Sequence, residues 1–320
     1  MTVTKNVLIF GATGLIGEHI TQAILDKKEN FQRIGIYISD NTLWTKSDDI
    51  ARLKSEGVEI FSGNLTSRGA INEALNGFDT VVSCVGRAII HHQVQLVELA
   101  DNHQDVKKFF PSEYGTDIEY GASSANERPH QQKLKVRAAL AKTKNLEYTY
   151  VVTGPYADAD TGLFLSARSL NDEQSGTFDA KRKRAVLLGD GEGKISLTTM
   201  HDVGRLTVTA LLHPEACKNR ALNVHSFTAT PSQIAAEFER QTGGQQWRMD
   251  YTSLETLRRL EARAYQQGSP SAGTLTLRRI WTEGGTLYEK RDNELVGMET
   301  GVETLAIAVG RAIKVQEAQS

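Results

Sequence analysis

A strand, a glycine-rich turn and a helix follow one another near the start of this 320-residue chain, and this succession constrains the fold most. Residues 7–10 form an unbroken apolar run, which is typical of a parallel strand buried on both faces. Glycines then recur at every third position, where they allow a tight turn, close approach of the backbone to a pyrophosphate and close packing of the helix on the sheet. The free amides of the helix N-terminus favour an anion, so the segment predicts a dinucleotide phosphate site. Its predicted cofactor-binding residues are Gly11, Thr13, Gly14, Leu15, Ile16 and Gly17.

The first half of the chain alternates strand patterns with helix patterns. Further strands are predicted at 33–38, 58–62, 79–85, 107–110 and 148–152, with helices between them at 48–56, 67–75, 89–102 and 127–144. This alternation predicts a Rossmann-type α/β fold, a doubly wound parallel sheet covered by helices, at residues 1–155. Ligands of such sheets lie beyond the carboxyl ends of the strands. The candidate ligand-binding segments are therefore those that follow Phe10, Ile38, Cys84, Phe110 and Val152.

The pattern is looser after Pro155, and we expect a smaller substrate-binding domain at residues 156–320, with some segments returning to the first domain. Its expected elements are two short strands within 176–193, strands at 195–199 and 222–225, and helices at 202–212, 231–241, 254–266 and 303–315. Residues 189–194 have the wrong spacing for a phosphate loop and predict a hairpin turn. The basic run at 181–184 is interpreted as a solvated loop or strand face.

The composition argues against several classes of protein. A formal net charge of −2 gives no electrostatic reason to expect nucleic acid or an anionic membrane as a partner. No apolar run approaches the roughly 18 residues of a membrane span, and we expect no secretory signal. Cys84 and Cys217 are too few and too far apart for a disulfide framework, which suits a cytoplasmic protein. His91 and His92 lack further ligands at metal-binding spacing, so we expect no metal. A monomer and a homodimer both stay open.

The segment after the second predicted strand selects the form of the dinucleotide. Asp40 is placed to bond an adenosine ribose 2′-hydroxyl and so favours NAD, although the same residue also suits a plain turn. Ser39 offers a hydrogen-bond donor to a 2′-phosphate, and Lys46 is close enough in sequence to meet one. These residues alone leave NAD and NADP open.

None of the nine tyrosines is followed by a lysine four positions later, so the Tyr-x-x-x-Lys proton donor of many short-chain reductases is absent. On the helix predicted at 127–144, His130, Lys133 and Arg137 lie on one face, and the apolar residues at 134, 138, 140 and 141 are expected to face the sheet. A lysine that is partly desolvated beside a positively charged nicotinamide has a lowered pKa and can act as a general acid or base. The alternative is that these cations solvate the surface of the helix.

The run at residues 111–117 resembles the Pro-Ser-Glu-Phe-Gly block of the NmrA-like and isoflavone reductase-like family, whose members are atypical relatives of the short-chain dehydrogenases. The family also begins with Gly-x-x-Gly-x-x-Gly, and its Lys-x-x-Val-Arg pattern matches residues 133–137, ahead of a strand that matches residues 148–151. Residues 198–204 resemble a further block of the family, and residues 150–158 are similar to its fungal members. The resemblance covers most of the chain.

In the reductase branch of this family the lysine at Lys133 is the proposed catalytic residue, the cofactor is NADPH and the substrates are phenolic or polycyclic aromatic metabolites. The resemblance therefore implies an NADPH-dependent reductase of a small aromatic metabolite, with Lys133 as proton donor or relay and His130 as a secondary candidate. The plant enzymes carry an arginine after the second strand, where this chain has Ser39 and Asp40, and Lys46 is the candidate replacement. The family also contains NAD(P)-sensing regulators without turnover, but the presence of Lys133 favours an enzyme.

We expect the nicotinamide and the substrate to meet where the strands end. The residues expected to contact the nicotinamide are Ser83, Val85, Gly86, Pro111, Ser112, Lys133, Gly154 and Pro155. The residues expected to line the substrate pocket are Tyr114, Tyr156 and Phe164. A sugar-nucleotide epimerase or dehydratase is disfavoured because the Tyr-x-x-x-Lys pair is missing.

Overall fold

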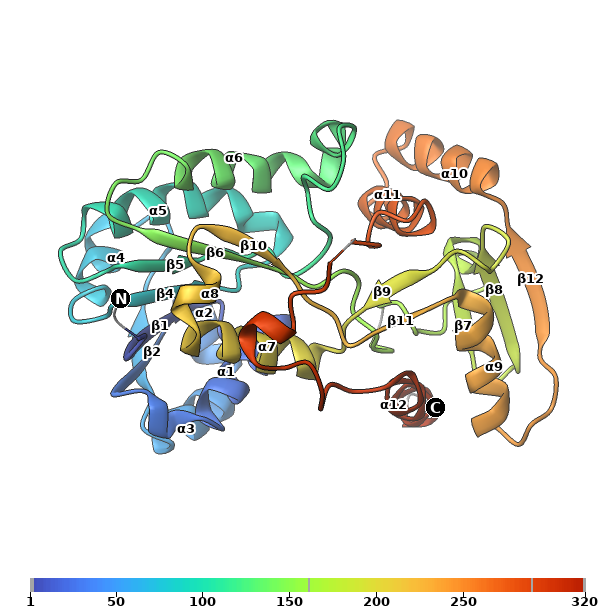
Figure 1. The fold of residues 1–320 in the computed structure, drawn as a ribbon, viewed down its shortest axis with the longest axis horizontal. Coiled ribbons are helices and arrows are strands. Elements are labelled where there is room, and N and C mark those ends of the chain that lie inside the picture. The colour runs from blue at the N-terminus through green and yellow to red at the C-terminus, as the bar shows by residue number, and fades with distance from the viewer. Residues whose placement is uncertain (1–2, 161, 289, 319–320) are drawn as a thin grey trace.

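The computed structural model describes residues 3–160, 162–288 and 290–318, which form one large sheet and two small ones. The large sheet has seven strands in the order β10-β6-β5-β4-β1-β2-β3, and every neighbouring pair is parallel (Figure 1). The predicted doubly wound α/β fold is thereby confirmed. The strand order reverses between β1 and β4, so a ligand is expected at the carboxyl ends of these two strands. The strands are β1 (Asn6–Phe10), β2 (Arg33–Ile38), β3 (Glu59–Ser62), β4 (Thr80–Ser83), β5 (Lys108–Phe110), β6 (Glu147–Val152) and β10 (Arg220–Asn223).

Helices cover both faces of the large sheet, which explains why β1 shows no alternation of apolar and polar residues. Val7 and Ile9 belong to the core under α1, α3 and α7, whereas Leu8 and Phe10 belong to the core under α4, α5 and α6. The helices of the first face are α1 (Leu15–Leu25), α3 (Ser47–Ser55) and α7 (Met200–Leu212), and those of the second face are α4 (Arg68–Ala74), α5 (Gln93–Asn102) and α6 (Gln131–Leu140).

Two segments from the second half of the chain complete this unit. Strand β10 pairs with β6 at the edge of the sheet, and α7 packs against α1. The two helices approach so closely that a Cβ added to Gly204 of α7 would lie 2.3 Å from the backbone oxygen of His19 in α1. The unit built on the large sheet is therefore made from both halves of the chain.

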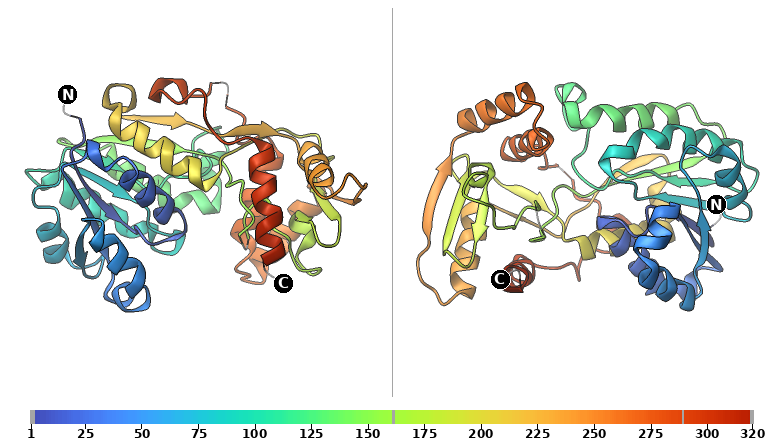
Figure 2. Two further views of the ribbon diagram at one scale, coloured as in Figure 1. Left: turned by 90° about the horizontal axis from the view of Figure 1, so that it is seen from below. Right: turned by 180° about the vertical axis from the view of Figure 1, so that it is seen from behind.

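The other elements form a second lobe beside the large sheet (Figures 1 and 2). In its three-stranded sheet β8 is parallel to β12 and antiparallel to β7, and β9 pairs with β11 separately. Aromatic rings pack together in its core: Phe178 and Phe238 are stacked with ring centroids 5.5 Å apart, and Trp247 is tilted against Phe238 with centroids 5.3 Å apart. Helix α12 packs against α9, as Figure 2 shows. The elements are β7 (Thr177–Asp179), β8 (Arg184–Leu188), β9 (Ile195–Leu197), β11 (Phe227–Ala229), β12 (Arg248–Thr252), α9 (Pro231–Gln241), α10 (Leu254–Gln266), α11 (Ala272–Thr282) and α12 (Leu305–Ala318).

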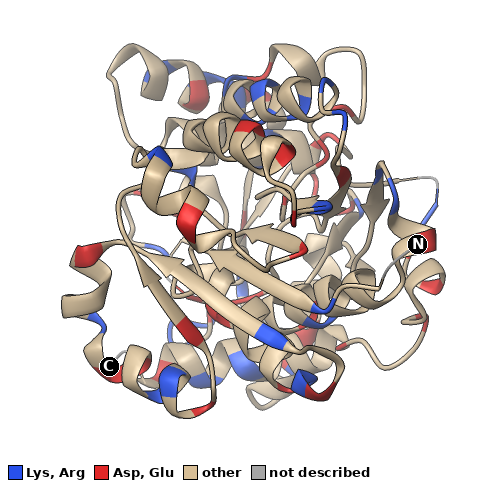
Figure 3. Cartoon of the chain, turned by 90° about the vertical axis from the view of Figure 1, so that its left-hand side faces the viewer, with Lys and Arg blue, Asp and Glu red and all other residues tan. Residues whose placement is uncertain are grey.

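Among the described residues, no helix is long and apolar enough to cross a membrane, and no group of three or more metal-ligating side chains gathers. Figure 3 shows that Lys and Arg are interleaved with Asp and Glu over the helices.

Short helices lie in several of the connections between the elements named above. They are α2 (Asp40–Thr45), α8 (Pro214–Cys217) and the 3₁₀ helices η1 (Lys28–Asn30), η2 (Arg87–His92), η3 (Ser124–Asn126), η4 (Arg128–His130), η5 (Glu173–Ser175) and η6 (Glu294–Val296).

The hairpin predicted at residues 189–194 and the interpretation of Asp40 as a turn residue are wrong, and α2, α8, α11, β11 and β12 were not predicted. Residues 189–194 are not a hairpin turn, because they connect β8 to β9, which belong to different sheets. The hairpin turn is formed instead by residues 180–183, between β7 and β8, where Lys183 has a φ of 49°. Asp40 is not in a turn, since it begins α2, whose N-cap is Ser39. Helix α11 was missed because Gly, Ser and Pro crowd the residues just before it.

Replacing Gly17 with alanine is expected to lower the free energy of unfolding by about 1–3 kcal/mol, the range typical of overpacking. A Cβ on Gly17 would lie 2.0 Å from the backbone oxygen of Gly11, so α1 would have to move away from the turn. Urea denaturation followed by circular dichroism measures the loss. The matched control is Gly69→Ala in α4, where an added Cβ meets nothing within 4 Å. Equal destabilisation of the two variants would contradict the prediction.

Candidate active site

The turn between β1 and α1 lets other groups approach its backbone closely. Gly11 has a φ of +77°, and a Cβ there would lie 2.8 Å from the backbone oxygen of Cys84. Gly14 is the N-cap of α1, and no side chain caps this helix. Leu15 is more than half exposed at the first helical position, whereas Ile16 is buried in the core. The amides at the start of α1 are therefore available to an anion.

A cavity of about 460 Å³ lies next to this turn, at the ends of β1 and β2. Ser39 and Asp40 line it, and Ser39 Oγ accepts a hydrogen bond from the backbone nitrogen of the residue three positions on. Lys46 is not part of its wall: Nζ donates to the backbone oxygen of Thr13 at 2.5 Å and pairs with Glu18 at 3.0 Å. Because Thr13 lines the cavity, the amine of Lys46 lies at its edge. The cavity is also lined by Gly11, Tyr37, Ile38, Asn41, Thr42, Gly63, Asn64, Leu65, Val85, Ile89 and His92.

Ser112 joins the residues that follow β4 to those that follow β5. Its Oγ donates to the backbone oxygen of Val85 at 2.9 Å, and its backbone nitrogen donates to Gln93 Oε1 at 2.8 Å. Ser83 is fully buried, and its Oγ has no hydrogen-bond partner among the described residues. Gly86 is exposed beside them. Of these predicted nicotinamide contacts, Gly86 is thus the one open to solvent, and Pro111 next to Ser112 is buried.

A buried ion pair connects the segment after β5 to helix α6. Arg137 donates through Nε and Nη2 to the two carboxylate oxygens of Glu113, at 3.2 and 3.0 Å, and Glu113 is 1% exposed. The third nitrogen of Arg137, Nη1, binds Asp117 and Glu119. The backbone oxygen of Glu113 accepts a hydrogen bond from Lys133 Nζ at 2.5 Å. Glu113 therefore fixes two of the three cations of helix α6, Lys133 and Arg137, and leaves Lys135 exposed.

The interpretation of these cations as a solvated helix surface is wrong for Arg137, and the predicted apolar face is only partly right. Helix α6 buries Val136, Arg137 and Leu140, whereas residues 138 and 141 are exposed and residue 134 is partly exposed. The face of α6 that is buried therefore differs from the predicted one, because the guanidinium of Arg137 binds Glu113 inside the protein instead of facing water.

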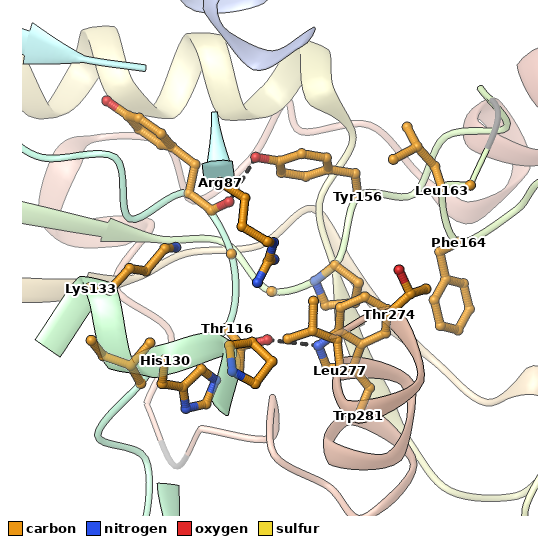
Figure 4. A pocket seen from close by; sticks show the side chains of 17 residues that line it. Arg87, Thr116, His130, Lys133, Tyr156, Leu163, Phe164, Thr274, Leu277 and Trp281 are labelled. Carbon is orange, nitrogen blue, oxygen red and sulfur yellow. Dashed lines mark hydrogen bonds between the residues drawn. The ribbon is translucent and has the colours of Figure 1, made fainter. Parts of the chain in front are cut away.

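Lys133 lines a second cavity, of about 220 Å³, and its side chain is drawn in Figure 4. Burial lowers the pKa of Lys133 to about 8, an effect that Glu113 opposes and the positive charge of Arg87 reinforces. At neutral pH the ammonium is therefore protonated, yet it releases its proton more readily than an exposed lysine does. A group with a pKa near the working pH is suited to general acid catalysis.

His130 lines the same cavity and is 2% exposed. Its Nδ1 lies 2.9 Å from the backbone oxygen of Ser124. Because a carbonyl oxygen only accepts, we assign the ring hydrogen to Nδ1, which makes Nε2 an acceptor. Nε2 is buried without a partner in the described part of the chain. Burial also lowers the pKa of His130, so the ring is neutral near pH 7.

The walls of the cavity around Lys133 come from segments far apart in the chain, as Figure 4 shows. Trp281 Nε1 donates to Thr116 Oγ1 at 2.7 Å, and the Tyr156 hydroxyl donates to the backbone oxygen of Tyr114 at 2.7 Å. The ring of Tyr114 belongs to the core between the large sheet and helices α1, α3 and α7, so this residue contributes mainly its backbone to the cavity wall. The ring centroid of Phe164 lies 5.9 Å from that of Trp281. The lining is completed by Arg87, Gly115, Ile118, Pro129, Gly154, Pro155, Gly162, Leu163, Thr274 and Leu277.

The sequence reasoning missed Arg87 and the wall that α11 provides. Arg87 directly follows the segment at the end of β4, where ligands of parallel sheets are expected, so its position carried a usable signal. Thr274, Leu277 and Trp281 carry no such signal. Their place in the wall depends on how the second lobe folds back toward the large sheet.

Replacing Arg137 with methionine is expected to lower the free energy of unfolding by about 3–5 kcal/mol, because it leaves the carboxylate of Glu113 buried without its cation. Guanidinium chloride denaturation measures the loss. The control variant Arg52→Met removes an exposed arginine that pairs with Glu56, and such surface pairs contribute little. A loss for Arg137→Met no larger than that of the control would contradict the prediction.

Comparison with known proteins gives the relatives of this chain. The sequence model of the NmrA-like family matches residues 3–276. The phenylcoumaran benzylic ether reductase PT1 of Pinus taeda is 30% identical over 241 residues, which are 74% of each chain. The oxidoreductase aprR of Aspergillus flavus is 28% identical over 304 residues, which are 92% of this chain and 95% of that protein. Among solved structures, the binary complex of leucoanthocyanidin reductase with NADPH from Vitis vinifera has the same fold, with a TM-score of 0.80 at 20% identity, covering 97% of this chain and 99% of that one.

Proposed function

Because this chain belongs to the NmrA-like family, we propose that it is an NADPH-dependent reductase of a small aromatic or phenolic metabolite. The observation that carries the proposal is the amino group of Lys133, fixed in a cavity with aromatic walls at the carboxyl end of the large sheet. The relatives described above are named as a reductase and an oxidoreductase, which supports the same reaction class. In this proposal residues 1–155, together with α7 and β10, bind the cofactor, and the rest of residues 156–320 bind the substrate.

The glycine turn fits the pyrophosphate of a dinucleotide, because it presents backbone amides and no Cβ that would keep an anion away. The cavity beside Ser39 and Asp40 is suited to the adenosine end, and the leucoanthocyanidin reductase structure, which contains NADPH, supports this form of the cofactor. NADPH supplies a hydride when it is bound. The residues proposed to hold it are Gly11, Thr13, Gly14, Leu15, Ile16, Gly17, Ser39, Lys46, Ser83, Val85, Gly86, Pro111, Ser112, Lys133, Gly154 and Pro155.

Lys133 supplies the proton in the proposed reaction. The backbone oxygen of Glu113 orients the ammonium, and burial keeps its pKa near neutrality. As an electron-poor carbon of a conjugated C=C, C=O or C=N bond accepts the hydride, the ammonium donates its proton to the atom on which negative charge develops. His130 is a secondary proton relay or substrate contact, because its free Nε2 can accept a hydrogen from a hydroxyl. Tyr156 and Phe164 line the substrate space.

The variant Lys133→Met is expected to slow hydride transfer in single-turnover measurements by about 100-fold or more, within the range of general acid catalysis. In the wild type, kcat/KM is expected to fall as the pH rises through about 8, because only the protonated lysine donates. The variant should lose this step. The control Lys135→Met, on the exposed side of the same helix, should retain both the rate and the pH profile.

Two outcomes would contradict this proposal. Unchanged hydride transfer by Lys133→Met, with cofactor still bound, would remove the lysine from the chemistry. A chain that binds NADPH but oxidises it with no aromatic metabolite would be an NAD(P)-sensing regulator instead. Partner binding that depends on the redox state of the dinucleotide would then identify that class.

The variant Lys46→Ala is expected to weaken NADPH binding by about 10-fold, as for the loss of one hydrogen bond to a charged group. NADH binding should stay within about two-fold, because NADH lacks the 2′-phosphate that we propose for this amine at the edge of the adenosine cavity. Calorimetric titration of both dinucleotides measures the difference, with the exposed Lys54→Ala as control. An equal loss for both would assign Lys46 to the support of the glycine turn through Thr13.

A further inference from the structure

Arg87 is a cation without a protein partner inside the cavity that contains Lys133. It begins η2, one residue after Gly86, and its guanidinium points into the cavity (Figure 4). In the part of the chain that the structure describes, its side chain forms no hydrogen bond and no ion pair. Arg137 and Arg279 are different, since each binds three carboxylates, and Arg278 donates to the backbone oxygen of Leu163. Arg87 is therefore not used to hold the protein together.

The lining of this cavity has an excess of positive charge. Arg87 and Lys133 are basic, and none of the lining residues is Asp or Glu. Burial lowers the pKa of Arg87, and the groups that oppose this effect are the tyrosine hydroxyls of Tyr156 and Tyr265 rather than a carboxylate. An arginine nevertheless stays protonated at any physiological pH. Arg87 is exposed to solvent, so water solvates its charge until a ligand that fills the cavity can neutralise it.

A ligand that fills the cavity takes water away from Arg87. Burying a guanidinium without a partner is costly, so a neutral ligand would bind against that cost. A carboxylate removes it, because its two oxygens match the fork of a guanidinium with two parallel hydrogen bonds. The rest of the wall includes Phe164, Leu277 and Trp281, which suit an aromatic ring. The volume of about 220 Å³ is below the roughly 300–1,000 Å³ of pockets for drug-sized ligands and favours a small molecule.

We propose that the substrate is a small aromatic carboxylic acid, with its carboxylate bound to Arg87 and its ring packed against the wall formed by Phe164, Leu277 and Trp281. The inference rests on the proposed function, because it concerns the same cavity, and it adds a substrate class and a specificity-determining residue. In this proposal Arg87 binds the carboxylate of the substrate, and Lys133 donates a proton when the conjugated bond is reduced.

The experiment measures binding without turnover. Calorimetry is carried out on the full chain saturated with NADP⁺, using cinnamate, 4-hydroxycinnamate and 2-naphthoate, each beside its neutral primary amide. At least one acid is expected to bind the wild type about 10-fold more tightly than its amide. Arg87→Gln should weaken that acid by about 10- to 100-fold and change the amide by less than about two-fold. Arg87→Lys, which keeps the charge but not the fork, should retain part of the preference. The exposed Arg52→Gln is the control for an arginine outside the cavity.

Three results would overturn the inference. Equal affinity of every acid and its amide would show that the cavity does not select a carboxylate. An equal loss of acid and amide in Arg87→Gln would give Arg87 a packing role. A larger loss of NADP⁺ than of the acid would make Arg87 a partner of the cofactor phosphates.

The outcome separates this inference from the proposed function. A chain that prefers acids yet oxidises no NADPH would overturn the reductase and leave the role of Arg87 standing. A chain that reduces neutral metabolites with no preference for acids would support the reductase and overturn the role of Arg87.

Discussion

The buried carboxylate of Glu113 determines where the candidate catalytic group lies. Its two oxygens bind Arg137, and neither charge can be left without the other except at a large cost in free energy. The segment after β5 and helix α6 are therefore fixed relative to one another, and the backbone oxygen of the same glutamate receives the hydrogen bond of Lys133. Neither Glu113 nor Arg137 lines the cavity. The geometry of the candidate catalytic lysine thus depends on an ion pair that lies outside the cavity.

The parts of the molecule that sequence predicts are those whose requirements are local. An apolar run and a glycine every third position each describe a few adjacent residues, and the sheet followed from such patterns. The choice of Lys133 as the catalytic candidate needed the resemblance to a family, because its spacing from Arg137 also suited a solvated helix surface. The wall of the cavity is different, because the hydrogen bond between Thr116 and Trp281 joins residues 165 positions apart, and no short pattern contains that contact. The hairpin at residues 180–183 escaped prediction because it places Lys183, rather than glycine or asparagine, at a positive φ.

Arg87 and Lys133 are electrostatically coupled, since the charge of the guanidinium is one of the causes that lower the pKa of the lysine. A carboxylate on Arg87 would cancel part of that influence and favour the protonated lysine. In the proposed complex, an acidic substrate therefore does more than anchor itself. It also raises the pKa of Lys133 and so favours the protonated form that the reduction requires, whereas a neutral ligand would leave this pKa lowered.

The return of β10 and α7 to the large sheet has a consequence for the synthesis of the protein. Strand β6 is synthesised some 70 residues before β10, its edge partner, and α1 is synthesised about 175 residues before α7, the helix that covers it. Until residue 223 is made, the nascent chain presents an unpaired strand edge, which is a template for pairing with another chain. For the same reason, exchanging lobes between relatives would require several junctions rather than a single cut.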